Sequence, residues 1–494
     1  MIDRRRVLRL GGLAAGGAVG VAMLPKGGGP SAAAATPVAT HTTTHATTAV
    51  QAAVGTPAAG PVAPFGSVRM PVPTVLTPTR AADGADVYAI PIQPAQVELM
   101  PGHPTAARTY GGQFTGPTIR ARTGRPVRVT YTNQLPTAAN VHLHGGHNPV
   151  VSDGYPLDII APGQSRTYEY PNRQQGATLW YHDHAHMLEA ENVYFGLHGF
   201  YLLEDDAERS LGLPTGAFDV PINLRDCALD ANGALLFGVE PALRTTVLAN
   251  GAVTPFFPVA ARKYRLRLLN SSLSRTFRLV LGGEDIIQIG SDGGLLPAPV
   301  RRSEIVLGPA ERADIVVDFS GHAVGSQLVL FDVTGAVLRF DVTRTAADAS
   351  VVPARLLPAA VLPPATVTRD VVFTFDVTGA APVGLINGKP FDPNRLDFEI
   401  KRGSTEIWRI FNGDVPLGAP HTFHMHLEQF KVLDRDGRAP LPADQGRKDT
   451  VFVPPGGRVR VQTTFTEFLG TYVFHCHFPE HSSMGMMAQF RIVP

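Results

Sequence analysis

Hydrophobic and polar residues alternate with a period of two along much of the chain. Clear runs are Arg312–Phe319 (RADIVVDF) and Arg458–Phe465 (RVRVQTTF). Because successive side chains of a strand point to opposite faces, this alternation predicts strands that bury one face. Gly, Pro, Asn and Asp separate the runs, which is typical of turns between short strands. Helical segments are expected to be minor, a turn or two around residues 187–193.

Two sequence markers each occur three times. An alternating strand that ends in Asn occurs at Arg125–Asn133, Arg262–Asn270 and Ser404–Asn412, and the Asn positions are 137 and 142 residues apart. Turns that begin at Pro162, Pro309 and Pro455 each precede another strand, and these prolines are 147 and 146 residues apart. Chance matches between common strand compositions are the alternative. Agreement of two independent spacings predicts three copies of one unit.

The chain of 494 residues is too long for a single hydrophobic core. Short strands in repeated units of about 140 residues predict an all-β protein of three domains, each a Greek-key β-sandwich or barrel. We place these domains at residues 65–208, 209–350 and 351–494, with 50 Gly and 43 Pro supplying the turns.

The N-terminal segment has the pattern of an export signal. Four arginines between Arg4 and Arg9 precede the apolar stretch Leu10–Leu24, and small residues suitable for cleavage follow. We therefore predict a twin-arginine signal peptide at residues 1–35, an Ala/Thr/Pro-rich tether at 36–64, and export to the periplasm, cell envelope or exterior. An N-terminal anchor helix is the alternative. The apolar stretch is short and rich in Gly, which favours cleavage and no stable membrane insertion afterwards.

The charge balance excludes several classes of partner. The formal net charge is +1, and five of the 43 basic residues but one of the 42 acidic residues precede Phe65, so the folded part is slightly acidic. This balance predicts no nucleic-acid partner. The sequence makes no prediction of the oligomeric state.

Ten of the 17 histidines fall into four tight groups, which are His142/His144, His182/His184, His421/His424/His426 and His475/His477/His481. In a strand, a His-x-His pair places both imidazoles on one face. Four such pairs supply eight imidazoles, and the alternative is a set of core histidines with ordinary hydrogen bonds. Copper is the metal favoured by imidazole donors, whereas calcium and magnesium prefer oxygen and one zinc ion needs only four ligands. Eight histidines therefore suggest three copper ions.

Cys476 lies between His475 and His477 and points to the opposite face, so it must serve a neighbouring metal. Together with His421, His481 and a Met from Met484, Met486 or Met487, it forms the ligand set of a blue-copper electron-transfer site. We reject a disulfide with Cys227, which is expected to be a lone buried thiol. Because Cys476 is the direct chain neighbour of His475 and His477, the backbone provides a covalent electron path from this copper to the other cluster.

With these residues the chain resembles the multicopper oxidases over about Phe65–Pro494. Within that family it is most similar to the bacterial spore-coat laccases, with phenoxazinone synthase and bilirubin oxidase as relatives. The segments that carry this closer resemblance are Ser152–Pro156, Leu179–His184, Ile289–Leu296 and Pro309–Arg312. The resemblance implies three cupredoxin-like Greek-key β-sandwich domains and four copper ions. It implies a type 2 copper on His142 and His424, one type 3 copper on His144, His182 and His477, the other on His184, His426 and His475, and a type 1 copper on His421, Cys476, His481 and axial Met486.

Asp153 matches the position of a family carboxylate near the cluster, so the resemblance implies a catalytic role in proton relay. Stabilising its turn or orienting a ligand imidazole is the alternative. We expect a laccase-like oxidase that takes single electrons from a small-molecule phenol or aminophenol and reduces dioxygen to water. The rivals are a metallo-oxidase of Cu(I) or Mn(II), and a non-enzymatic cupredoxin scaffold in the cell envelope.

Overall fold

The computed structural model describes residues 64–359 and 361–494. The predicted signal peptide and all of the predicted tether except Pro64 lie outside the described residues. Within the described residues, no helix is both long and apolar enough to span a membrane. The fold is all-β, as predicted, with three sandwiches that follow one another along the chain.

The first sandwich pairs a five-stranded sheet with a four-stranded sheet. The first sheet contains β1 (Thr79–Arg80), β2 (Asp86–Met100), β3 (His103–Tyr110), β5 (Val127–Asn133) and β7 (Ser165–Tyr170). The second contains β4 (Gly116–Arg122), β9 (His198–Glu204), β8 (Ala177–His182) and β6 (His142–His144). Tyr and aliphatic side chains from both sheets form the core between them.

The second sandwich has sheets of seven and five strands. The larger contains β12 (Ala252–Val253), β11 (Thr246–Ala249), β10 (Asp219–Cys227), β14 (Lys263–Asn270), β19 (Arg312–Asp318), β16 (Ile286–Ser291) and β17 (Gly294–Arg302). The smaller contains β13 (Phe256–Ala261), β21 (Gly335–Thr345), β20 (Gln327–Asp332), β15 (Phe277–Leu281) and β18 (Ile305–Leu307). Cys227 is a buried free cysteine, as predicted.

The third sandwich has sheets of six and five strands. The first contains β23 (Val383–Ile386), β22 (Val367–Asp376), β25 (Thr405–Asn412), β30 (Arg458–Thr464), β27 (Phe430–Arg435) and β28 (Arg447–Lys448). The second contains β24 (Phe398–Lys401), β32 (Met487–Val493), β31 (Gly470–Cys476), β26 (His421–Met425) and β29 (Thr450–Val453). Most of the candidate ligands in this half of the chain therefore lie on or beside the five-stranded sheet.

Both repeat markers have the same structural role in each sandwich. The Asn133 amide donates to two backbone carbonyls that close the strand end, and Asn270 and Asn412 do the same in the other two copies. The backbone oxygen of each Asn accepts from the second residue of a proline turn, over 2.7, 2.8 and 3.0 Å. The two spacings match because the two markers are in contact.

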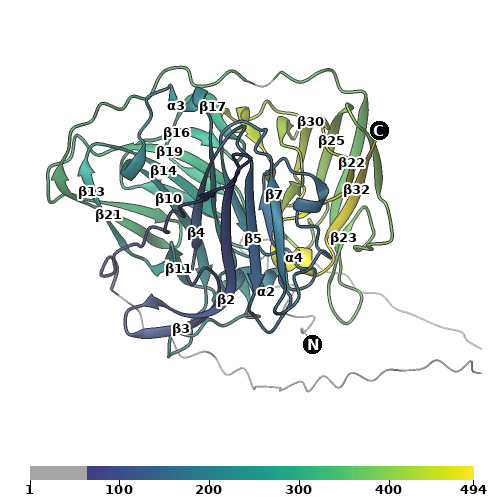
Figure 1. Ribbon diagram of the computed structural model, residues 1–494, viewed down its shortest axis with the longest axis horizontal. Coiled ribbons are helices and arrows are strands. Elements are labelled where there is room, and N and C mark those ends of the chain that lie inside the picture. Colours follow the sequence, from purple (N-terminus) through teal and green to yellow (C-terminus); the bar gives the residue numbers. More distant parts are fainter. Residues whose placement is uncertain (1–63, 360) are drawn as a thin grey trace, which may run out of the picture.

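Helices are few and short in residues 64–359 and 361–494, as the sequence predicted. They are α2 (Glu189–Tyr194), α3 (Asp206–Arg209) and α4 (Pro479–Ser483), with 3-10 turns η1 (Val150–Ser152), η2 (Gly216–Phe218), η3 (Pro241–Leu243) and η4 (Pro442–Gln445). Helix α2 overlaps the segment where a turn or two was expected. It packs against α4, so the first and third sandwiches meet there (Figure 1).

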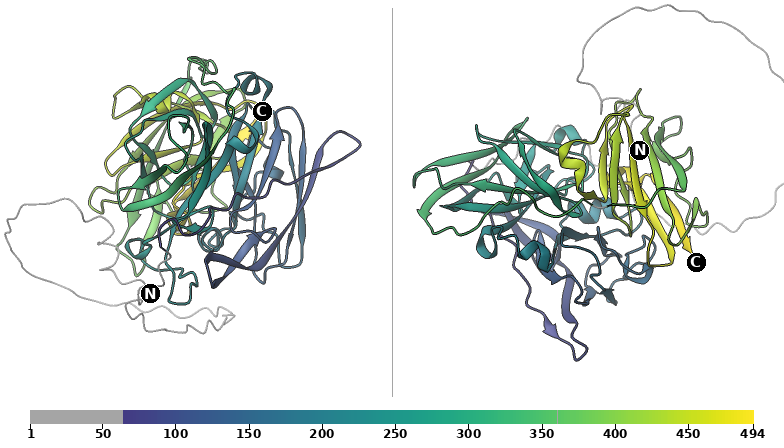
Figure 2. Two further views of the ribbon diagram at one scale, coloured as in Figure 1. Left: turned by 90° about the vertical axis from the view of Figure 1, so that its left-hand side faces the viewer. Right: turned by 90° about the horizontal axis from the view of Figure 1, so that it is seen from above.

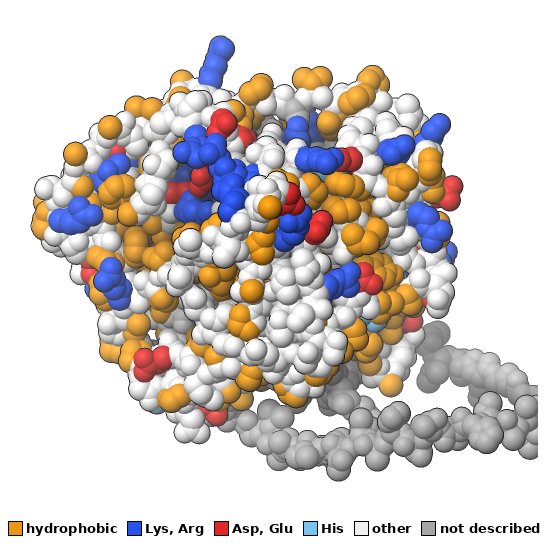
Figure 3. Space-filling view, in the orientation of Figure 1, with side chains coloured by type: hydrophobic (Ala, Val, Ile, Leu, Met, Phe, Trp, Pro, Cys, Tyr) orange, Lys and Arg blue, Asp and Glu red, His pale blue; other side chains and the backbone are white. Residues whose placement is uncertain are grey.

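The three sandwiches pack side by side rather than as a string. In Figure 1 the second sandwich lies on the left, the third on the right and the first in front between them, and Figure 2 shows the same grouping from two other sides. A segment after β21 crosses the top of the view to reach β22. On the face in Figure 3, acidic and basic side chains lie beside one another at several places, with hydrophobic side chains spread between them.

Candidate metal centre

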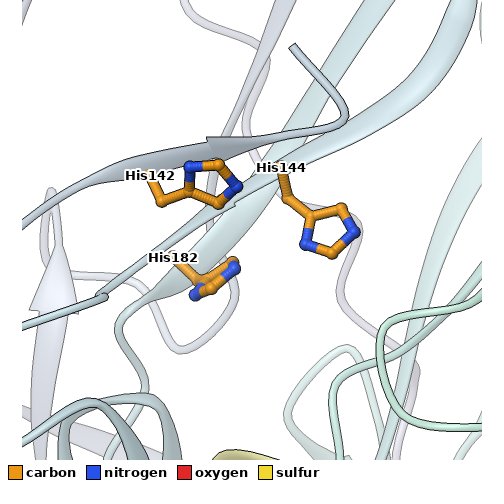
Figure 4. A group of neighbouring side chains, drawn as sticks. All are labelled: His142, His144 and His182. Carbon is orange, nitrogen blue, oxygen red and sulfur yellow. The ribbon is translucent and has the colours of Figure 1, made fainter. Parts of the chain in front are cut away.

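Four His-x-His pairs from the first and third sandwiches meet in one buried place. In the first sandwich, β6 lies antiparallel to β8 with His142 opposite His182, and Figure 4 shows His144 gathered with them. In the third, β26 lies antiparallel to β31 with His424 opposite His475. The pairs extend just past the strand ends, where His426 and His477 still donate backbone hydrogen bonds across the sheet. All eight imidazoles are at most 3% exposed.

Imidazole rings from the first and third sandwiches lie close enough to bind the same metal ion. His144 Nδ1 lies 3.1 Å from His477 Nε2, which lies 3.3 Å from His182 Nε2. His184 Nε2 lies 3.1 Å from His475 Nε2, and His426 joins this pair to form a group whose ligand atoms are within 4.8 Å of one another. The two trios that the resemblance implies are thus each brought together, with His142 and His424 stacked beside them.

The ring nitrogens that face outwards are held by hydrogen bonds. His142 Nδ1 donates to Asp153 O over 2.6 Å, and His424 Nδ1 donates to Asp449 O over 2.8 Å. The Nε2 atoms of both rings, and that of His426, have no hydrogen-bond partner among the described residues. Fixing one nitrogen as a donor leaves the other as a free lone pair, which is how metal-binding histidines are oriented. The donor set therefore fits a metal cluster.

The protonation of these histidines also suits a metal. Burial lowers the pKa of all eight, to about 3 for His182 and about 4 for His475. The neutral imidazole is the form that binds metal ions. Burial here removes the competition from protons.

A second group lies on the other face of β31. Cys476 Sγ is 3.4 Å from His421 Nδ1 and 3.5 Å from His481 Nδ1, and the two nitrogens are 3.2 Å apart. His421 Nε2 donates to Asp414 Oδ2 over 2.8 Å, which turns Nδ1 towards the sulfur. Burial raises the pKa of the Cys476 thiol to about 12, so a cation is needed to hold it as a thiolate.

Met484, Met486 and Met487 are the candidates for the methionine of the Cys476 group, and Met486 has the best position. It is fully buried in the same apolar cluster as Cys476, and its backbone oxygen accepts from Cys476 N over 3.1 Å. Met487 is paired with His475 in the sheet and so faces the side away from Cys476. Met484 lines a surface cavity.

Asp153 contacts the cluster twice, through its backbone oxygen to His142 and through Oδ2, which accepts from His426 Nδ1 over 2.8 Å. Its loop can pack this closely because a Cβ on the next residue, Gly154, would collide with the carbonyl of Val141. Burial raises the pKa of Asp153 well above its usual range. These contacts are compatible with either orientation of ligands or proton transfer.

Sequence reasoning missed the contribution of the middle sandwich. Arg312 donates to Thr178 O of the first sandwich over 2.9 Å and to Asp449 Oδ1 of the third over 2.7 Å. The same Asp449 oxygen accepts from His144 Nε2 over 2.9 Å. The segment Pro309–Arg312 was noticed as a family feature, but no local pattern marks Asp449, because only the packing of three sandwiches brings it to His144.

The remaining histidines near the cluster have other partners. His147 lies 3.4 Å from Glu428 and 3.5 Å from Glu467, and His198 contacts Asn223 and Arg225. Asp183, inside the second pair, accepts from the backbone of Asn140 and Ala185, which supports the local fold.

A cavity of about 250 Å³ reaches the edge of the Cys476 group. His481 lines it together with the apolar side chains Phe375, Pro420, Phe478 and Met484. The loop before η3 closes one side, and Glu480 stands at the rim. Glu480 forms a two-point ion pair with Arg244, whose side chain is only 1% exposed, with one N–O distance of 3.0 Å.

Three sandwiches, a Cys/His/Met group and an adjoining eight-histidine cluster define the class of copper-dependent oxidases. Family models described as multicopper oxidase match residues 91–208 and 362–494. A laccase of Bacillus stratosphericus is 34% identical and covers 86% of this chain and 98% of its own length. The chain belongs to the multicopper oxidase family and is an oxidoreductase that uses copper and dioxygen.

Two further comparisons agree. Bilirubin oxidase of Albifimbria verrucaria is 36% identical, over 87% of this chain and 82% of that protein. The crystal structure of a laccase from Pediococcus acidilactici superposes with a TM-score of 0.82 at 32% identity, covering 89% of this chain and 97% of the other.

Proposed function

We propose that the protein is a laccase-like oxidase that takes single electrons from phenols or aminophenols and reduces dioxygen to water with four copper ions. The type 1 copper is assigned to His421, Cys476, His481 and Met486. The type 2 copper is assigned to His142 and His424. The type 3 coppers are assigned to His144, His182 and His477, and to His184, His426 and His475. The observation that carries the proposal is the apolar cavity that ends at His481.

Copper supplies the one-electron redox steps, and the chain separates them in space. Substrate electrons enter where the cavity meets His481, outside the cluster. They reach the cluster through Cys476 and one peptide unit to His475 or His477, which point to the opposite face of β31. Four such electrons and four protons convert one dioxygen to two waters.

The cavity favours an organic reductant over a metal ion. Its walls are mainly apolar, which suits an aromatic ring. Hard cations such as Mn(II) need several oxygen ligands, but the Glu480 carboxylate is already paired with Arg244. Nine methionines in the whole chain, with no cluster outside the ligand loop, offer little for Cu(I). A non-enzymatic scaffold has no need of a complete ligand set, so the complete set found here argues against that alternative.

Oxygen uptake by the copper-loaded protein tests the proposal, with a panel of phenols, aminophenols, bilirubin, Cu(I) and Mn(II). We expect uptake with phenols and aminophenols at least ten times faster than with either metal ion. Faster uptake with Cu(I) or Mn(II) would favour the metallo-oxidase, and uptake with none of them the scaffold.

Export by the twin-arginine route is part of the proposal and rests on residues 1–35, which the structure does not describe. Replacing both Arg5 and Arg6 by Lys should leave the precursor uncleaved inside the cell. Mass spectrometry of the exported wild-type protein should then identify a new N-terminus near residue 35.

A further inference from the structure

Glu189, the first residue of α2, is a buried carboxylic acid with no evident structural task. Its side chain belongs to a residue that is 4% exposed, and neither carboxylate oxygen has a hydrogen-bond partner among the described residues. It faces the Ser482 and Ser483 hydroxyl groups of α4, which lie close enough to lower its pKa but do not reach hydrogen-bond geometry with it. A buried polar group without a partner is costly, so its retention calls for a functional explanation.

The neighbouring acids have partners that Glu189 lacks. Glu191 on α2 pairs with Arg108, and Glu480 on α4 pairs with Arg244. Asp183 accepts two backbone hydrogen bonds. No ion pair to Glu189 occurs among the described residues. Glu189 can therefore gain and lose a proton without breaking an ion pair.

The protonation equilibrium of Glu189 lies in a useful range. Burial raises its pKa to about 7, the charge of Asp183 raises it slightly, and the Ser482 and Ser483 hydroxyls lower it. Both the acid and the carboxylate are populated near neutral pH, which is the condition for efficient proton transfer.

Helix α2 connects a cluster strand to the helix that contains His481. Its N-terminus follows His184 of the cluster, and Glu189 N donates to Ala185 O over 2.9 Å. The helix against which it packs, α4, contains His481 of the Cys476 group (Figure 1). The Glu189 backbone thus adjoins the segment that follows the cluster ligand His184, and its carboxyl faces the helix beside the cavity.

We propose that Glu189 supplies protons for dioxygen reduction, with the Ser482 and Ser483 hydroxyls as its contact groups on α4. Each turnover consumes four electrons from the reducing substrate and four protons. Glu189 gives up one proton at a time and regains it from solvent, with no net change in the protein. This inference rests on the proposed oxidase function, and it is separate from the prediction for Asp153.

The test is anaerobic reduction of copper-loaded enzyme by a phenol, followed by rapid mixing with dioxygen. In Glu189→Gln we expect full copper content, a normal blue band and normal reduction by the phenol, but reoxidation slower by about 10²-fold. Glu191→Gln on the same helix is the matched control and should reoxidise at the wild-type rate. Failure of the phenol to reduce wild-type enzyme would contradict the proposed function, whereas normal reoxidation of Glu189→Gln would overturn this inference alone.

Relocation of the carboxyl separates proton supply from structural support. Because Ser482 faces Glu189, the double variant Glu189→Gln/Ser482→Glu places a carboxyl in the same space, and reoxidation should recover to within about tenfold of the wild-type rate. No recovery in a copper-loaded double variant would overturn the role.

A measurement on the wild-type enzyme keeps the inference testable if Glu189→Gln does not fold. Infrared difference spectroscopy should detect the C=O stretch of a buried protonated carboxyl that disappears as pH rises through neutrality, and Glu189→Asp should shift this band. If the wild-type enzyme has no such band, the inference is wrong.

Discussion

Cys476 is the residue at which the two candidate copper groups are joined, because its side chain faces His421 and His481 while its chain neighbours face the cluster. Cys476→Ser should lose the intense thiolate-to-copper absorption and all turnover but keep the copper bound by the eight histidines. Cys227→Ser is the matched control. Cys227 is a buried free thiol in the second sandwich, so this variant should leave the colour unchanged. Absorption spectra with metal analysis check both, and a blue Cys476→Ser variant would exclude the assignment.

Met486 is predicted to tune the potential of the same copper. An axial thioether donates electron density that stabilises Cu(II), so Met486→Leu should raise the reduction potential. Each ~60 mV is a tenfold change in the equilibrium constant of a one-electron couple. Redox titration of Met484→Leu, which alters the cavity wall, should give the wild-type value. An unchanged potential in Met486→Leu together with a raised potential in Met484→Leu would assign the axial ligand to Met484.

A substitution at Asp153 can distinguish proton relay to the cluster from orientation of the ligand imidazoles. Asp153→Asn keeps the shape but removes the titrating group beside His426. If Asp153 relays protons, copper content and reduction by substrate should persist while reoxidation by dioxygen slows by ~10² to 10⁴. Stopped-flow reoxidation of the fully loaded variant is the measurement. Normal reoxidation excludes the relay, and loss of copper supports orientation of the ligands.

At the scale of elements, the loop before η3 and helix α4 form the cavity together, and the Arg244–Glu480 pair connects them. Arg244→Met would leave Glu480 charged and unpaired at the rim, so the cavity should prefer cationic reductants. We expect kcat/KM for a cationic aromatic amine relative to a neutral phenol to rise about tenfold, or ~1.4 kcal/mol.

The matched control is Arg278→Met, which breaks a more exposed Arg–Glu pair with Glu304. Its kcat/KM ratio should equal that of the wild type. If a folded Arg244→Met variant has an unchanged kcat/KM ratio, the Arg244–Glu480 pair has no role in substrate selection.

At the scale of the whole molecule, Arg312 of the middle sandwich connects the other two at the cluster, through Thr178 and Asp449. Arg312→Leu leaves the buried Asp449 carboxylate without its arginine partner, which costs roughly 3–5 kcal/mol. Because Asp449 also accepts from His144, the variant should bind less copper at the cluster as well as unfold at a lower temperature.

Arg267→Leu is the control for stability alone. Arg267 pairs with Asp219 over 2.7 Å and donates to Thr178 over 3.0 Å in a buried network between the first two sandwiches. It should lower the unfolding temperature while the copper content stays complete. Calorimetry and metal analysis distinguish the variants, and full copper content in Arg312→Leu would contradict the link to the cluster.

The all-β class, the three repeats and the grouping of the histidines could be predicted from the order of the amino acids alone. These features depend on local rules, since alternation reports one buried strand face and a His-x-His pair shares that face whatever the fold around it. The separation of Cys476 from His475 and His477 follows from the same rule. The repeats were visible because Asn133, Asn270 and Asn412 each close a strand end by the same hydrogen bonds.

Which histidine pairs meet, and which residues surround them, depends on how the three sandwiches pack. His144 and His477 are 333 residues apart, and contact between them depends on how the first and third sandwiches pack. Asp449, Arg244 and Glu189 carry no local signature, because an ion pair or a buried carboxyl is defined by partners from other elements. The segment that contains Arg312 was noticed, but it gave no indication of which residues Arg312 contacts. Strand periodicity constrains the direction of a side chain, but its neighbours across a domain interface depend on the packing of whole sheets.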